Sequence, residues 1–100
     1  MLSYRPPFAS MLTSRRFVIS GRVQGVGFRY FVQSIAVRES IAGWVRNLDD
    51  GRVETAAAGE PDAMDRFERA IRQGPPASRV DHVRVDDGFP LVGQNGFHIR

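Results

Sequence analysis

The chain has 100 residues, 42% of them hydrophobic, which is the size of one ordinary domain with a single core. It contains no cysteine, which excludes disulfides, thiolate metal sites and thiol nucleophiles. All 14 basic residues are arginine, so Schiff-base chemistry and the Gly-Lys-Ser/Thr type of phosphate loop are excluded as well. The net charge of +3 is scattered along the chain and predicts only a weak attraction for anions.

The N-terminal stretch, residues 1–14, carries Pro6 and Pro7 among polar groups, and we expect it to form a flexible tail. Met11 is an alternative start, because regular patterning begins only after it. We therefore expect one domain over residues 15–100. Apolar runs stay short of the roughly 18 residues that a membrane span needs, and the tail does not resemble a secretory signal. These features favour a cytoplasmic protein without membrane contact.

A strand and a helix are predicted first. Apolar residues alternate from Arg16 to Val23, which is the period of a strand. The pattern breaks at Gln24–Gly27, and a spacing of three and four residues then begins at Phe28, which predicts a helix with one buried stripe. The stripe consists of Phe28, Phe31, Val32, Ile35 and Ala36.

A hairpin and a second helix follow. The strands Gly43–Asn47 and Arg52–Ala57 are joined by Asp49-Asp50-Gly51, since Asp-Gly tolerates the backbone angles of a tight turn. Pro61 starts the second helix, and Gly74-Pro75-Pro76 ends it. Its apolar stripe is Met64, Phe67 and Ile71, and its outer face has the acid–arginine pairs Asp62/Arg66, Asp65/Arg69 and Glu68/Arg72 at i,i+4.

The chain ends in two more predicted strands, Val80–Val85 and, after the turn Asn95-Gly96, Phe97–Arg100. The order of elements is β-α-β-β-α-β with a terminal strand, which matches the plan of two split β-α-β units. We predict an α+β fold, a ferredoxin-like α/β sandwich (βαββαβ). Its antiparallel sheet has two helices on one face and a short fifth strand.

The segment Gly21–Arg29 is the main candidate site. It joins a strand to a helix N-terminus, where unpaired N–H groups and the positive helix end favour an anion. Glycines allow close backbone approach and a concave nest of amides, although they can also merely shape a bend. Arg29 lies in the first helical turn, where a cation opposes the helix dipole unless an anion lies between them. Its guanidinium can bind two phosphate oxygens, or it can simply be solvated, and the same choice holds for Arg22.

Asn47 is the second candidate. In a split β-α-β unit the first two strands run the same way, so the end of Gly43–Asn47 lies at the edge that carries the glycine turn. Its amide can accept a hydrogen from water and donate to an oxygen, and so can hold an attacking water in line. The alternative is that Asn47 is a turn residue beside the hairpin.

These residues include no evident general acid or base, nucleophile or metal cluster. A mixed carboxylic–phosphoric anhydride tolerates that, because its carboxylate leaving group, whose acid has a pKa of about 4, departs unprotonated. Positioning and charge stabilisation then suffice. An alkyl phosphate monoester would need assistance that the sequence does not offer.

The sequence resembles the acylphosphatase family over residues 15–100. The motifs are Gly21-Arg22-Val23-Gln24-Gly25-Val26-Gly27-Phe28-Arg29, Gly43-Trp44-Val45-Arg46-Asn47 and Asp50-Gly51-Arg52-Val53-Glu54. The resemblance implies that Arg29 binds the phosphate and Asn47 positions the water. It also implies that the phosphate cradle is built from the amides of Val23, Gln24, Gly25, Val26, Gly27 and Phe28. One departure is Ser40, where members often have glycine after the first helix; a left-handed serine there costs about 1 kcal/mol.

The resemblance further implies hydrolysis of small acyl phosphates to a carboxylate and inorganic phosphate, without metal or cofactor. Inorganic phosphate or sulfate is expected to compete with substrate. We expect a monomer that binds neither nucleic acid nor membrane.

The sequence bears on two other functions. Ferredoxin-like sheets often bind RNA through stacked aromatics, but the strand Arg52–Ala57 offers none. An idle phosphate-binding or regulatory domain, resembling segments of larger carbamoyl-transfer proteins, remains open; the intact Arg29 and Asn47, and a chain that ends without partner domains, favour an enzyme.

His82 and His98 each stand alone in a short strand and are expected on the surface. Phe28, Phe31, Trp44 and Phe67 are expected in the core.

Overall fold

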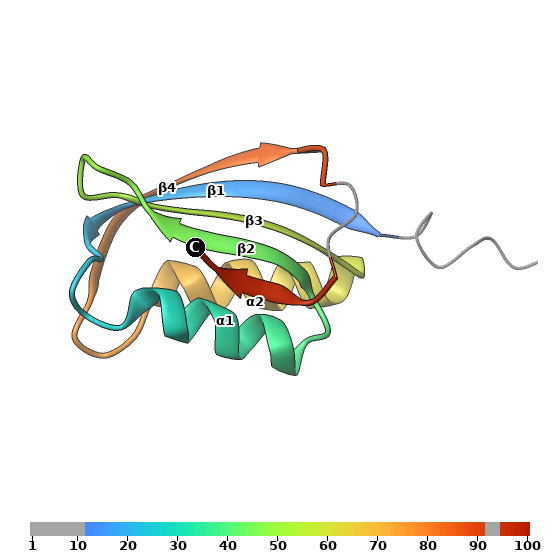
Figure 1. Ribbon diagram of the computed structural model, residues 1–100, viewed down its shortest axis with the longest axis horizontal. Coiled ribbons are helices and arrows are strands. Elements are labelled where there is room, and N and C mark those ends of the chain that lie inside the picture. The colour runs from blue at the N-terminus through green and yellow to red at the C-terminus, as the bar shows by residue number, and fades with distance from the viewer. Residues whose placement is uncertain (1–11, 92–94) are drawn as a thin grey trace, which may run out of the picture.

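A computed structural model of the chain describes residues 12–91 and 95–100. Five strands form one sheet, and two helices lie side by side under the same face of it (Figure 1). This is the predicted ferredoxin-like α+β sandwich. The elements are β1 (Thr13–Arg22), α1 (Phe28–Arg38), β2 (Ala42–Asn47), β3 (Val53–Gly59), α2 (Pro61–Gln73), β4 (Arg79–Asp87) and β5 (Phe97–Ile99).

The strand order is β4-β1-β3-β2-β5. β3 pairs antiparallel with both β1 and β2, and β4 pairs antiparallel with β1. β5 differs from the expected antiparallel pattern, because it pairs parallel with β2. The chain crosses from β4, at one edge, to the opposite edge, where β5 continues the sheet beyond β2.

β1 begins two residues before the expected start of the domain. Thr13 pairs with Gly59 and Ser14 with Ala58, so the ladder to β3 extends into the segment that was expected to be tail. The rest of that segment, residues 1–11, lies outside the described residues.

The core lies between the sheet and the helices, and the predicted helix stripes face it. Phe17 contacts Phe67 with ring centroids 5.8 Å apart, and Phe67 contacts Phe97 at 6.2 Å. The largest fully buried side chains are Phe17, Phe28, Phe67, Ile19, Met64, Ile71, Val23, Val32, Val45, Val53 and Thr55. Phe31 is partly buried against this cluster.

Trp44 is buried as expected, but on the other face of the sheet. It alternates along β2 with Val45, which belongs to the core. The guanidinium groups of Arg46 and Arg100 lie 5.3 and 4.5 Å from its ring centroid and cover the indole. The prediction that Trp44 is buried is therefore correct, but the residue lies on the open face of the sheet and not in the core between sheet and helices.

α1 ends as the sequence predicts. Ser40 is left-handed, with φ +56°, and its N–H donates to the Val37 carbonyl at 3.2 Å. The N–H of Ile41 donates to the Ala36 carbonyl at 2.8 Å, which completes a Schellman motif. Serine at this glycine position costs about 1 kcal/mol.

Only one of the three acid–arginine pairs expected on α2 is among the ion pairs found in the described residues: Arg72 lies 3.1 Å from Glu68. Arg66 instead lies 2.8 Å from Glu39 at the end of α1, and Asp65 lies 3.3 Å from Arg15 on β1. Arg66 and Asp65 thus pair with residues of other elements and not with the expected partners on α2.

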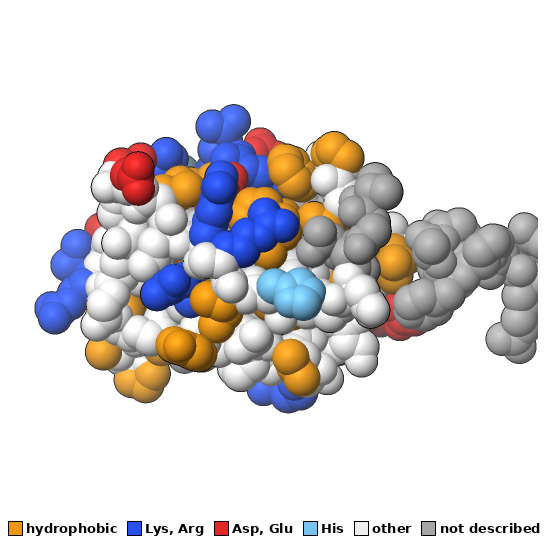
Figure 2. Space-filling view, viewed as in Figure 1, with side chains coloured by type: hydrophobic (Ala, Val, Ile, Leu, Met, Phe, Trp, Pro, Cys, Tyr) orange, Lys and Arg blue, Asp and Glu red, His pale blue; other side chains and the backbone are white. Residues whose placement is uncertain are grey.

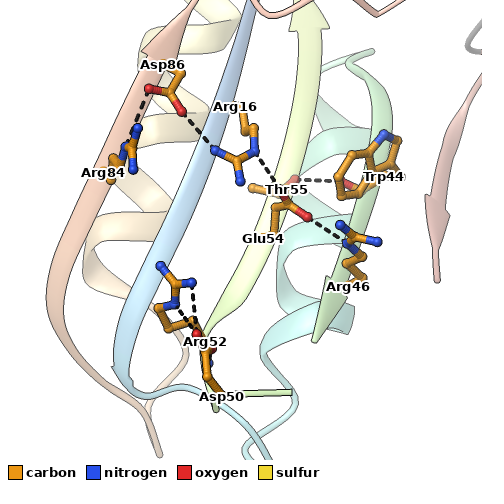
Figure 3. A network of polar contacts seen from close by, with 9 residues as sticks. All are labelled: Arg16, Trp44, Arg46, Asp50, Arg52, Glu54, Thr55, Arg84 and Asp86. Carbon is orange, nitrogen blue, oxygen red and sulfur yellow. Dashed lines mark hydrogen bonds and ion pairs between the residues drawn. The ribbon is translucent and has the colours of Figure 1, made fainter. Parts of the chain in front are cut away.

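A chain of charged side chains crosses four strands on the open face of the sheet (Figure 3). The carboxylate of Glu54 on β3 is 5% exposed and accepts hydrogen bonds from Arg16 on β1 at 2.5 Å and from Arg46 on β2 at 2.6 Å. Arg16 also donates to Asp86 on β4 at 2.9 Å. Since Arg46 directly precedes Asn47, this network helps to fix the end of β2 against its neighbours.

Burial acts to raise the pKa of Glu54, but the hydrogen bonds from Arg46 and Arg16 outweigh it and hold the pKa below its ordinary value of 4.5. A carboxyl whose pKa is lower in the folded state stabilises the fold above its ordinary pKa. This stabilisation is lost as the pH falls through the folded-state pKa.

Glu54→Gln is therefore expected to lower the free energy of unfolding by about 2 kcal/mol at pH 7, because it removes a charged acceptor from two arginines. The difference from the parent protein should shrink as the pH is lowered below 4.5. Urea unfolding between neutral and acidic pH measures this, with Asp49→Asn, an exposed carboxylate, as control. A difference that is independent of pH would contradict the role of the Glu54 charge.

Candidate active site

A glycine turn connects β1 to α1 (Figure 1). Gly25 and Gly27 have φ of +73° and +76°, in the left-handed region. A Cβ atom built on either would meet nothing within 4 Å. Glycine is thus required here by the backbone angle and not by crowding, and the space beside the turn stays open.

The N-terminus of α1 is free to receive an anion. Gly27 is the N-cap, and its carbonyl accepts the first helical hydrogen bond, from Phe31 at 3.0 Å. Within the described chain no side chain caps this end, and the first turn of α1 holds no acidic residue. The first N–H groups of a helix have no partner within it, so they and the positive helix end point into the open space.

A cavity of about 110 Å³ lies at this point. Arg29, in the first turn of α1, and Asn47, the last residue of β2, both line it. The full lining is Val23, Gly25, Gly27, Phe28, Arg29, Tyr30 and Asn47. Four of the six residues expected in the phosphate cradle and both expected catalytic residues thus meet at one small hollow.

The other two cradle residues direct their side chains elsewhere. Val26 packs against the hydrophobic core. The side-chain amide of Gln24 donates to the carbonyls of Leu48 and Arg52 in the β2–β3 turn. Their contribution to a cradle is therefore limited to backbone amides.

Strand pairing brings Asn47 to the cavity. Val53 on β3 pairs with Asn47 on one side and with Ile19 on the other, so these residues form one row across three strands. Asn47 lies on the same face as Val45, which is the face covered by the helices.

Arg29 forms a hydrogen bond with the last residue of the chain as given. Its Nη1 donates to the backbone carbonyl of Arg100 at 3.3 Å. The Arg100 guanidinium in turn stacks on Trp44 beside Arg46. Figure 2 shows basic side chains gathered on this part of the surface. The region around the cavity is thus rich in positive charge, which favours an anionic ligand.

Tyr30 also lines the cavity, although the sequence did not mark it as a candidate. Its side chain is 70% exposed, although it is large and borders the cavity. The available signal was its position directly after Arg29 in the first turn of α1.

The two histidines lie apart from this cavity. His82 and His98 are exposed on β4 and β5, as expected, and a ring nitrogen of His98 contacts the Asn95 carbonyl at 2.7 Å. Among the described residues, no three His, Asp or Glu side chains gather as potential metal ligands, and no helix is long and apolar enough to cross a membrane.

A larger open groove lies between α2 and β4, and its lining balances three arginines, Arg15, Arg69 and Arg72, against three carboxylates, Asp65, Glu68 and Asp87. Arg15 contacts Asp65, Glu68 and Asp87 at 3.3, 3.4 and 3.0 Å. This groove therefore offers no excess of either charge to a ligand.

The ferredoxin-like sandwich defines a small α+β protein, and Arg29 and Asn47 border a cavity at the N-terminus of its first helix. Comparison with known proteins identifies one family. The acylphosphatase family model matches residues 15–99, and the chain belongs to the acylphosphatase family. Its function is that of an acylphosphatase.

The similarity extends over most of the chain. An acylphosphatase of Koribacter versatilis is 48% identical over 86 residues, which are 86% of this chain and 78% of that protein. An acylphosphatase of Bacillus subtilis is 48% identical over 84 residues, or 84% and 92% of the two chains. The crystal structure of acylphosphatase from Bacillus subtilis superimposes with a TM-score of 0.84 at 45% identity, covering 88% of this chain and 98% of that one.

Proposed function

We propose that Arg29 and Asn47 are the catalytic residues with which this acylphosphatase hydrolyses the carboxyl–phosphate anhydride bond of small acyl phosphates. The observation that supports this most directly is the shared cavity, in which both side chains border the free end of α1. Family membership supports the reaction class.

The phosphoryl group would be bound by the backbone amides from Val23 to Phe28 and by Arg29. Nη1 of Arg29 donates to the Arg100 carbonyl, which leaves other guanidinium donors free for two phosphoryl oxygens. These donors are in place before substrate binds, so they stabilise the charge on the phosphoryl oxygens in the transition state without reorganisation.

Asn47 would orient the attacking water. Its side-chain carbonyl accepts a hydrogen from the water, and its NH₂ group donates to a phosphoryl oxygen. The water oxygen forms a bond to phosphorus while the bond from phosphorus to the acyl oxygen breaks. The carboxylate leaves as an anion, and the water proton passes to a phosphoryl oxygen or to solvent, so no acidic or basic side chain is required.

The size of the cavity bears on the substrate. About 110 Å³ is suited to a phosphoryl group but not to a bulky acyl group as well. The acyl group would extend past exposed Tyr30 into solvent. We propose that the chain works without metal or cofactor as a cytoplasmic monomer, binds neither nucleic acid nor membrane, and is inhibited by inorganic phosphate or sulfate.

The sequence left open a domain that binds phosphate without turnover, and membership of the acylphosphatase family favours the enzyme. Purified protein incubated with benzoyl phosphate and a chelator decides between the two. We expect release of inorganic phosphate at a rate unaffected by the chelator, since the proposed chemistry needs only amides, Arg29 and Asn47. Binding of phosphate without hydrolysis would support the alternative.

Arg29→Lys is expected to lower kcat/KM for benzoyl phosphate by about 100-fold or more, because a point charge cannot bind two oxygens as a planar guanidinium does. The melting temperature should change little, since Arg29 lies at the rim of the cavity and outside the core. Activity of the lysine variant within a few-fold of the parent would contradict the proposed role.

Asn47→Ala is expected to lower kcat by about 100-fold while the inhibition constant of inorganic phosphate stays within about threefold, because orienting water is separate from binding the phosphate. Steady-state kinetics with phosphate as competitor measure both. Equal weakening of phosphate inhibition would instead make Asn47 a binding residue.

A further inference from the structure

The side chain of Gln24 connects the glycine turn before α1 to the turn between β2 and β3. Its Nε2 donates to the Leu48 carbonyl at 2.7 Å and to the Arg52 carbonyl at 2.9 Å. Gln24 belongs to the glycine turn, whereas Leu48 and Arg52 flank the turn between β2 and β3. One amide group therefore links the loop that precedes α1 to the hairpin that carries Asn47.

The two acceptors are themselves held together. The Leu48 N–H donates to the Arg52 carbonyl at 2.8 Å, and the Gly51 N–H donates to the Leu48 carbonyl at 3.2 Å. Leu48 directly follows Asn47 in the chain. A displacement of Gln24 relative to this closed turn is therefore a displacement of the glycine turn relative to Asn47.

The link depends on a group with two hydrogens on one atom. Both hydrogens of the Gln24 amide are used, one for each carbonyl oxygen. A carboxylate of the same shape has no hydrogen and would be repelled by both oxygens. The side chain is half-buried, so water competes only partly for these bonds.

We propose that Gln24 is a positioning residue that sets the distance between the bound phosphoryl group and Asn47, in addition to lending its backbone amide to the cradle. This inference rests on the proposed function, because it acts through the water held by Asn47. In-line attack depends steeply on geometry, and a misplacement of about 1 Å can cost about 100-fold in rate. The link therefore acts on turnover more than on phosphate binding.

The first test is Gln24→Met, which keeps the length of the side chain and removes both donors. With benzoyl phosphate we expect kcat to fall by about 10- to 100-fold while the phosphate inhibition constant changes less than about threefold. The matched control is Gln33→Met: the Gln33 amide also donates to a backbone carbonyl, that of Phe97 at 3.2 Å, away from the cavity. Its kcat should equal that of the parent. A lowered melting temperature with unchanged kcat in Gln24→Met would overturn the proposal.

The second test is Gln24→Glu, which gives a pH signature that a purely structural role would not produce. At pH 7 the carboxylate cannot donate, and kcat should be as low as in Gln24→Met. As the pH falls towards about 4.5, the carboxyl becomes protonated and donates one bond, so the ratio of variant to parent kcat should rise several-fold. A ratio that stays constant with pH would overturn the proposal, even if the methionine variant does not fold.

The third test measures whether Gln24 acts through Asn47. In the Asn47→Ala background, Gln24→Met should lower kcat by less than about threefold, since no side chain remains to be positioned. An undiminished loss would overturn the proposal. The failure of the Gln24 inference is also distinct from failure of the proposed function, because the latter would appear as an inactive parent protein or an unaffected Asn47→Ala variant.

Discussion

The cavity depends on one pairing constraint: β3 lies between β1 and β2 and is antiparallel to both. Two strands that share an antiparallel neighbour run in the same direction, so the end of β1 and the end of β2 reach the same edge of the sheet. Val53 fixes the register by pairing with both Ile19 and Asn47, which places the latter two about 10 Å apart across the row. A slip of one residue in β2 would turn Asn47 to the open face, away from α1.

Most of the proposed recognition comes from the backbone. The amides of the proposed cradle belong to the glycine turn and the first turn of α1, where Gly25 and Gly27 have left-handed backbone angles. In the proposed site, side chains add what amides cannot supply: positive charge from Arg29 and a combined donor and acceptor from Asn47. This division explains why so few chemically specialised side chains border the cavity, and why an anhydride, which needs no proton donor, is the substrate that suits it.

The sequence predicted features that depend on local rules. The elements follow from periodicity, and the place of Asn47 follows from the shared direction of β1 and β2. The left-handed Ser40 follows from the resemblance to proteins that have glycine at this helix end. What it missed depends on partners distant in the chain. Arg66 has a nearby acid on its own helix, yet pairs with Glu39, and Trp44 is buried by arginines on the face opposite the core. Neither periodicity nor local spacing carries this information.

Because two arginines cover Trp44, the fluorescence of this residue is sensitive to its charged surroundings. Trp44 is the only tryptophan in the chain, and its emission depends on the charges close to the indole ring. One of those charges belongs to Arg100, whose carbonyl accepts a hydrogen bond from Arg29. Arg100 thus connects Trp44 to the Arg29 guanidinium at the cavity. Intrinsic tryptophan fluorescence can therefore report ligand binding at the cavity without an introduced dye.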